Sequence, residues 1–104
     1  MDKFNLMQIL SSMDKKPLAK HVFCTTNHLK AQVMLLQAGH SIPPCKMDND
    51  VLFYFLKGNG TITIDNKSKP IEPGDCIIVP NEAGSRSINA ESDMEILAVQ
   101  GIKH

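Results

Sequence analysis

Cys45 and Met47 are the residues whose types and spacing come nearest to a metal-binding or reactive pair. They lie two residues apart, so on a strand both would share one face. Two sulfur donors suit a soft ion such as Cu(I), which would still need another sulfur or nitrogen ligand. Polarisable side chains of this kind also fill irregular space in protein cores. We favour packing over a copper site, and a reactive Cys45 thiol is the third interpretation.

A catalytic role for Cys45 would require a base or a positive charge that favours the thiolate. Lys46 is adjacent in sequence, but on a strand it points to the opposite face. Cys76 is expected to pack as a small hydrophobic residue. No two histidines have the i, i+2 spacing that two ligands on one strand face need; they are His21, His28, His40 and His104. We therefore predict no catalytic residue.

For the charged residues near Cys45 and Ser85, a structural role is the first explanation. Asp48 and Asp50 lie in the segment MDND, whose composition is typical of a turn. They would replace missing metal ligands only if that loop folded inwards. Glu82 and Arg86 flank Ser85 and could form an ion pair at the rim of a pocket. Arg86 could instead hold a carboxylate or a phosphate, so its role stays open.

Residues 51–56 form the most apolar run of the chain, and they are the element that would position these side chains. One alternating face holds Val51, Phe53 and Phe55, and the other holds Leu52, Tyr54 and Leu56. Because both faces are apolar, we expect a strand that is buried on both sides.

The remaining elements follow from apolar periodicity and from turn-forming residues. A short helix is predicted over residues 4–10, with Asp2 as its cap and Ser11 and Ser12 at its end. Strands are predicted over residues 19–26, 29–38, 51–57, 60–65, 75–79, 84–89 and 94–100. Short strands separated by turns every 8 to 12 residues or so indicate an all-β sandwich or barrel.

Two segments of the chain resemble the two sequence motifs of the cupin superfamily. In residues 39–60 the spacing of Gly39 and Gly58 fits the first motif. Cys45, Met47 and Val51 then occupy the places of its two histidines and its glutamate. The glycine frame is therefore kept while the metal ligands are replaced.

The second motif is matched by residues 74–89. Gly74, Pro80 and Asn89 keep its frame, whereas Glu82 replaces a glycine and Ser85 replaces a histidine. The segment PGDCIIVP, residues 73–80, is the most specific match. Together with GNGTITID, residues 58–65, the resemblance extends over about residues 30–100.

The resemblance implies an all-β fold, a cupin-type double-stranded β-helix or jelly-roll barrel with a short N-terminal helix. One domain would span residues 1–104, with the core barrel at about 17–100. The four ligand positions would line the cavity, and strand alternation adds Phe53 and Phe55 beside Val51 and Ser87 beside Ser85. We expect a mostly apolar ligand-binding cavity without metal or cofactor, formed by Cys45, Met47, Val51, Phe53 and Ser85.

The composition limits the partners. The chain has 104 residues, with 11 basic and 11 acidic ones, so its formal net charge is zero. No block of like charge favours nucleic acid or a membrane surface as a partner, and no apolar run has the roughly 18 residues of a membrane span. The N-terminus does not resemble a secretion signal. Three cysteines do not make a disulfide framework, so we expect a cytoplasmic protein.

These observations lead to a binding or structural module as the first hypothesis, in which a homodimeric cupin holds a small organic ligand or none. The outer face of residues 51–56 needs a partner, which favours the dimer. The alternative is a cupin isomerase, decarboxylase or dioxygenase acting on a sugar, small acid or aromatic compound. It would need a relocated metal site or a metal-free mechanism, with His21 or His40 facing Cys45. A sensor that acts through a DNA-binding partner ranks last.

Overall fold

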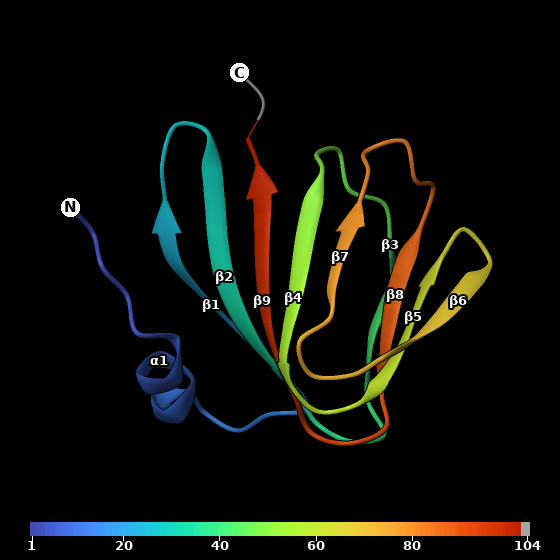
Figure 1. The fold of residues 1–104 in the computed structure, drawn as a ribbon, viewed down its shortest axis with the longest axis horizontal. Helices are drawn as coiled ribbons and strands as arrows, with labels where there is room; N and C mark the ends of the chain where they lie inside the picture. The colour runs from blue at the N-terminus through green and yellow to red at the C-terminus, as the bar shows by residue number, and fades with distance from the viewer. Residues whose placement is uncertain (103–104) are drawn as a thin grey trace.

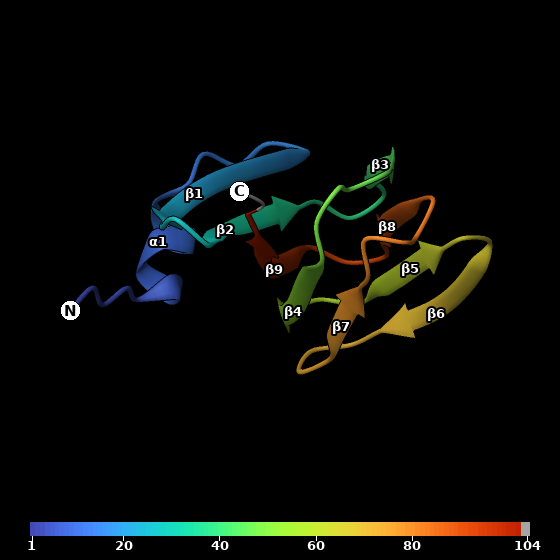
Figure 2. The ribbon, with the colours of Figure 1, turned by 90° about the horizontal axis from the view of Figure 1, so that it is seen from above.

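In the computed structural model, which describes residues 1–102, nine strands form two facing antiparallel sheets (Figure 1). The five-stranded sheet has the order β1 (Leu18–Thr25), β2 (Leu29–Leu36), β9 (Met94–Gly101), β4 (Val51–Lys57), β7 (Cys76–Val79). The four-stranded sheet has the order β3 (Ser41–Cys45), β8 (Arg86–Ala90), β5 (Gly60–Ile64), β6 (Lys67–Ile71). Seen from above, the sheets form two layers, with β7 beside β5 and β6 (Figure 2). The predicted all-β jelly roll with a short N-terminal helix is confirmed.

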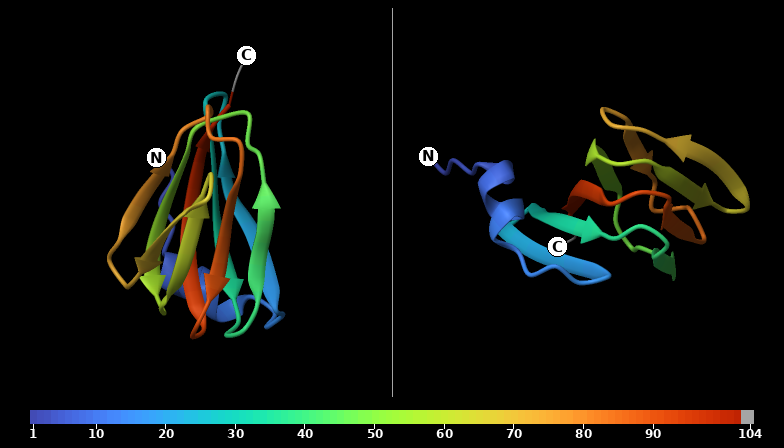
Figure 3. Two further views of the ribbon diagram at one scale, coloured as in Figure 1. Left: turned by 90° about the vertical axis from the view of Figure 1, so that its right-hand side faces the viewer. Right: turned by 90° about the horizontal axis from the view of Figure 1, so that it is seen from below.

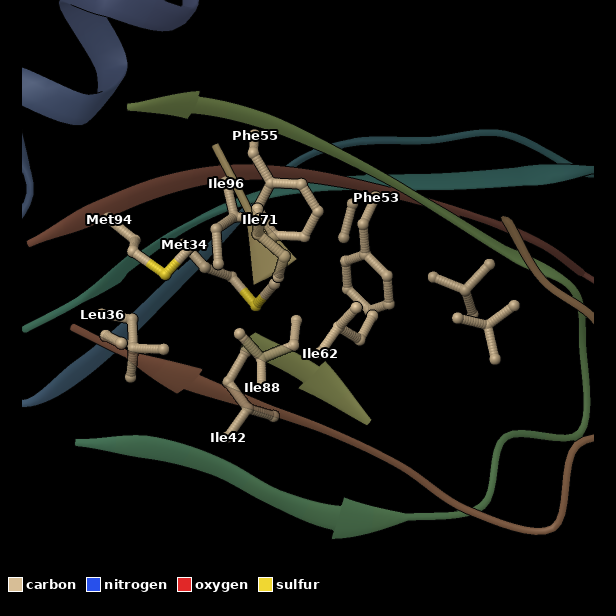
Figure 4. Close-up of a cluster of buried hydrophobic side chains, with 14 of the residues drawn as sticks. Met34, Leu36, Ile42, Phe53, Phe55, Ile62, Ile71, Ile88, Met94 and Ile96 are labelled. Atoms are coloured by element: carbon tan, nitrogen blue, oxygen red, sulfur yellow. The ribbon is translucent and has the colours of Figure 1, made fainter. Parts of the chain in front are cut away.

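The core lies between the sheets (Figure 4). The four-stranded sheet contributes Ile42, Ile62 and Ile88, and the five-stranded sheet contributes Met34, Leu36, Phe53, Phe55 and Ile96. These residues alternate along each strand with outward-facing ones, as strand geometry requires. The rings of Phe53 and Phe55 are stacked, with centroids 6.3 Å apart. A single apolar layer therefore joins the two sheets.

Strand β4 is buried on only one face within this chain. Phe53 and Phe55 on the inner face are 1% and 0% exposed, but on the outer face Leu52 and Leu56 are half-buried and Tyr54 is 38% exposed. The expectation of burial on both faces is therefore wrong for the single chain. The reason is topological, because the second sheet covers only the inner face of the five-stranded sheet.

The helix α1 (Leu6–Ser12) begins and ends two residues later than predicted. Its cap is Asn5 rather than Asp2, since the Asn5 side chain accepts a hydrogen bond from the Gln8 N–H. The hydroxyls of Ser11 and Ser12 donate to carbonyls one turn earlier, which keeps both serines in the helix. The helix packs against β2. Within residues 1–102, no helix has the length and apolarity to span a membrane.

Strands β3 and β6 are absent from the sequence prediction. Each is an edge strand of the four-stranded sheet, and each contains proline, at Pro43 and Pro44 in β3 and at Pro70 in β6. Proline has no N–H to donate to a neighbouring strand, but it is tolerated on an edge strand, where its nitrogen can face solvent. The polar, proline-containing sequences of these segments therefore resemble turns although they pair as strands.

The hairpin β5–β6 closes through the two residues Asp65 and Asn66, both with positive φ, 47° and 70°. Positive φ at both central residues is typical of a type I′ turn, which matches the twist of paired strands. The Asp65 carboxylate also accepts hydrogen bonds from the backbone N–H groups of Gly84 and Ser85, at 2.9 and 3.0 Å. The turn is therefore tied to the loop that precedes β8.

Candidate functional site

Arg86 is the first residue of β8, and its side chain extends from the four-stranded sheet towards Phe53 of the five-stranded sheet. On β8 the residues Ile88 and Ala90 are buried, so strand alternation turns Arg86 towards the same interior. Its guanidinium carbon lies 5.2 Å from the centroid of the Phe53 ring, which belongs to the opposite sheet. A cation at this distance is attracted by the ring face. Arg86 thus bridges the interior from β8 to β4.

The guanidinium of Arg86 has buried donors without acceptors. Its Nε and Nη1 atoms are buried and have no hydrogen-bond partner. Burial lowers the pKa of Arg86 from its ordinary value, and the nearby Cys45 side chain partly raises that pKa again. Buried charged donors left unpaired are costly and rare in folded proteins. The interior therefore presents a positive charge whose donors lack an acceptor.

Of the five predicted cavity residues, three lie in or against the core, and Cys45 lies next to Arg86 in the four-stranded sheet. Val51 and Phe53 are buried in the core, and Met47 is half-buried against it. Cys45 is exposed at the end of β3, where it is the register partner of Arg86 across the two strands. The Cys45 thiol lies 3.4 Å from the Lys46 carbonyl oxygen. These four predicted residues are therefore three buried or half-buried apolar side chains and one exposed thiol.

Ser85, the fifth predicted residue, is half-buried and lies immediately before β8. The inward position on the strand is Arg86, one residue later. Ser87 belongs to the opposite face from Ile88, so its expected place on the cavity side is wrong. The apolar residues Ile88 and Ala90, two positions apart, could have indicated from the sequence that Arg86, rather than Ser85, lies on the inward face.

The loop of residues 80–85 forms the rim of the site, and side chains of two other segments, the β3–β4 loop and the β5–β6 turn, hold it. The Lys46 ammonium donates to the carbonyls of Asn81 and Ala83, at 3.2 and 3.3 Å. The Asp50 carboxylate accepts the Asn81 N–H at 2.8 Å, and Asp65 accepts two more N–H groups. Asp50 therefore joins two loops, in keeping with its expected turn-forming role. The rim is held in place before any ligand binds.

The residues at the four motif positions do not fit the metal that the cupin motifs imply. Val51 offers no donor atom, and among residues 1–102 no three His, Cys, Asp or Glu side chains gather to hold an ion. A metal cation here would also lie close to the Arg86 guanidinium, which repels it.

The three histidines within residues 1–102 are exposed, and none lies on β3 with Cys45. His21 is exposed on β1, and His40 is exposed in the turn before β3. His28 is exposed in the turn between β1 and β2, and His104, which we expect to be disordered at the terminus, lies outside the described residues. Neither His21 nor His40 provides the acid or base that the enzyme hypothesis places beside Cys45.

The fold and the sequence together define a small single-domain cupin. The family model described as Cupin domain matches residues 32–100, about two thirds of the chain, and the chain belongs to this family. No curated protein matches its sequence.

Solved structures with the same fold include proteins of different kinds. A cupin superfamily protein from Desulfitobacterium hafniense has 16% identity and a TM-score of 0.83, covering 99% of this chain and 94% of that one. A conserved protein of unknown function from Streptococcus pyogenes has 20% identity and a TM-score of 0.82, covering 99% and 89%. A salicylate 1,2-dioxygenase from Pseudaminobacter salicylatoxidans has 18% identity and a TM-score of 0.77, covering 81% of this chain and 26% of that one. Identities this low establish the shared fold only.

Proposed function

We propose that this cupin binds a small organic anion without the family's metal centre and without a cofactor. The observation that supports the proposal is the pair of buried Arg86 donors, Nε and Nη1, that have no acceptor beside Phe53. A carboxylate would supply acceptors and an opposite charge, and hydrogen bonds between ionised partners are the stronger kind. Arg86 therefore takes the place of the metal as the positive charge of the barrel.

The surrounding residues have distinct roles in this proposal. Phe53, Val51 and Met47 form the apolar wall against which the ligand body packs, while Cys45 and Ser85 lie at the rim. Few polar groups in an apolar pocket are the usual arrangement of a small-molecule site. The enzyme alternative gains no support, because the histidines it needs beside Cys45 lie elsewhere.

Replacing Arg86 with methionine should weaken salicylate binding by about 10- to 150-fold, because a hydrogen bond to a charged group contributes about 1.5 to 3 kcal/mol. Salicylate is a reasonable first probe, since the dioxygenase above is named for this aromatic carboxylate. Binding would be measured by isothermal titration calorimetry. Benzyl alcohol, a neutral probe of similar shape, should bind both proteins equally weakly.

Two controls separate charge from geometry and from metal. The Arg86→Lys variant keeps the charge but loses the planar guanidinium, so its affinity should lie between those of wild type and Arg86→Met. The wild-type sample, purified without chelator or immobilised metal, should contain far less than one transition metal per chain. Zn²⁺ added in excess should leave salicylate affinity unchanged. One tightly bound metal per chain, or equal affinities of wild type and Arg86→Met, would contradict the proposal.

We also propose that the protein is a homodimer that pairs through the outer face of the five-stranded sheet. Strand register places Ile78, Leu52 and Val99 in one row, and Tyr54 and Leu97 in the next. Ile78 is 56% exposed, and this apolar surface has no covering layer over β4. Contiguous exposed apolar surface commonly marks an interface. A net charge of zero does little to oppose association of two copies.

Light scattering during gel filtration should give about twice the 11.5 kDa chain mass for the wild type. The double variant Tyr54→Lys, Ile78→Lys should elute as a monomer with an unchanged circular dichroism spectrum, because two lysines on each copy would face each other in the interface. Thr61→Lys, on the outer face of the four-stranded sheet, should leave the dimer intact. A wild type that stays monomeric at high concentration would rule the interface out.

We further propose a cytoplasmic location. Cys24, Cys45 and Cys76 are free thiols. Free thiols persist in reducing compartments.

A further inference from the structure

A groove opens where the edges of the two sheets meet. Strand β6 is the edge of the four-stranded sheet, and β7 is the edge of the five-stranded sheet. Between them lies a cavity of about 380 Å³, lined by Ile62 and Ile64 of β5, Lys67 and Lys69 of β6, and Cys76, Ile77 and Ile78 of β7. Cys76 is exposed there, so the expectation that it packs as a small hydrophobic residue is wrong. Figure 3 (left) views the molecule from the side on which β6 lies. We call this cavity the β6–β7 groove.

The β6–β7 groove combines an apolar floor with two cations. Ile71 of β6 is buried in the core, so alternation directs Lys69 and Lys67 to the same inner face of the strand. Ser68 lies on the outer face, where its hydroxyl is 2.8 Å from that of Thr63. No aspartate or glutamate lines the groove. The groove is therefore suited to a molecule with apolar and anionic parts.

Strand register links the groove to Arg86. Ile64 is the partner of Arg86 on one side and of Lys67 on the other, across β8, β5 and β6. On the facing sheet Ile77 is the partner of Phe53. Neighbouring strands lie about 4.8 Å apart, which separates the Cα atoms of Arg86 and Lys67 by roughly 10 Å. Ile64 and Ile77 thus line the groove and are also the register partners of Arg86 and Phe53.

We propose that the ligand is an amphipathic carboxylate that enters through the β6–β7 groove. Its carboxylate binds Arg86, its apolar body lies along Ile64 and Ile77, and Lys67 and Lys69 attract it to the entrance. This inference rests on the proposed function, because Arg86 is the anchor in both. Beyond that function, the inference specifies the class of ligand and the route by which the ligand enters. A pair of like charges at the mouth of an apolar cleft raises the local concentration of an oppositely charged ligand.

Edge protection is the competing explanation for the two lysines. Inward-pointing charges on an edge strand discourage pairing with another chain, and lysine is common in this role. A glutamate would serve that purpose equally well but would repel an anion. Charge reversal at Lys67 and Lys69 therefore separates the two explanations.

The experiment titrates octanoate into protein whose isoleucine methyl groups are ¹³C-labelled, and follows each methyl by NMR. Octanoate should shift the methyl signals of Ile62, Ile64 and Ile77, while Ile96, packed away from the groove, should change little. The variant Lys67→Glu, Lys69→Glu should bind octanoate about tenfold more weakly at low salt, and the difference should shrink as salt screens the charges. Octanol and acetate, which each lack one half of the ligand, should bind more weakly than octanoate.

The other possible outcomes distinguish failure of the groove inference from failure of the proposed function. Salicylate binding that depends on Arg86, without octanoate shifts at the groove methyls, would overturn the groove inference and leave the proposed function standing. The groove inference would likewise fail if the double glutamate variant binds octanoate as well as wild type does. Octanol binding as tight as octanoate binding would indicate apolar partitioning alone and would also overturn the inference. If neither salicylate nor octanoate binds, both proposals fail.

Discussion

Replacing Gly58 with alanine is expected to lower the free energy of unfolding by about 3 kcal/mol or more. Gly58 has φ of 90°, and a left-handed conformation costs an L-residue about 1 to 2 kcal/mol. A Cβ at this position would also overlap the backbone carbonyl of Asp93 and lie 2.8 Å from the Met94 Cα. Backbone atoms cannot give way as a flexible side chain can, and overpacking adds about 1 to 3 kcal/mol. Urea unfolding followed by circular dichroism measures the loss.

Gly74 provides the matched control for Gly58. Its φ of 95° is similar, but an added Cβ would have no heavy atom within 4 Å. Gly74→Ala should therefore cost only the conformational strain of about 1 to 2 kcal/mol. Equal losses in the two variants would mean that the close approach of the β4–β5 turn to the turn before β9 does not matter for stability.

Truncating Phe55 to alanine should destabilise the fold by about 3 to 5 kcal/mol, the usual range for a buried phenylalanine. Phe55 is 0% exposed, and it packs beside Phe53 between the two sheets. The loss combines the removed apolar contact with a cavity that two hydrogen-bonded sheets cannot easily close. Thermal and urea unfolding of the purified variant measure it.

The same substitution at Phe4 is the control for Phe55. Phe4 is 42% exposed and contacts Phe23 at a centroid distance of 5.1 Å. Phe4→Ala should cost about 1 kcal/mol, the contribution of one aromatic pair. If Phe55→Ala is no more destabilising than Phe4→Ala, the interior around Phe53 is not a closely packed layer.

The fold could be predicted from the sequence because two patterns are evident in short segments. Glycine and proline indicate the turns, and alternating apolar residues indicate the strands. The apolar run of residues 51–56 predicted β4, and the turn residues predicted most of the other strands. Strands β3 and β6 could not be found this way, because each has only one buried residue, Ile42 or Ile71, and its edge position tolerates proline. The sequence also did not reveal that the outer face of β4 is uncovered within one chain. An apolar strand face gives the same sequence pattern whether a second sheet or another copy of the protein covers it.

The candidate site was harder to predict because it depends on register. Motif spacing assigned the inward position to Ser85, whereas the alternation of β8 gives it to the next residue, Arg86. A slip of one residue reverses every side chain on a strand. The absence of acceptors around Arg86, which motivates the proposed function, is a property of packing between β8 and β4. No local pattern encodes that contact.

The β5–β6 hairpin has a consequence for the order in which the chain folds. Its two-residue turn closes locally, and isolated hairpins form within about 1 to 10 microseconds. Strand β4, in contrast, must find β9, with residues 58–93 between them, and such long closures make all-β domains fold in milliseconds to seconds or so. An early hairpin would already hold the Asp65 carboxylate in position. The loop that later carries Arg86 into the interior would then meet a ready acceptor for its N–H groups.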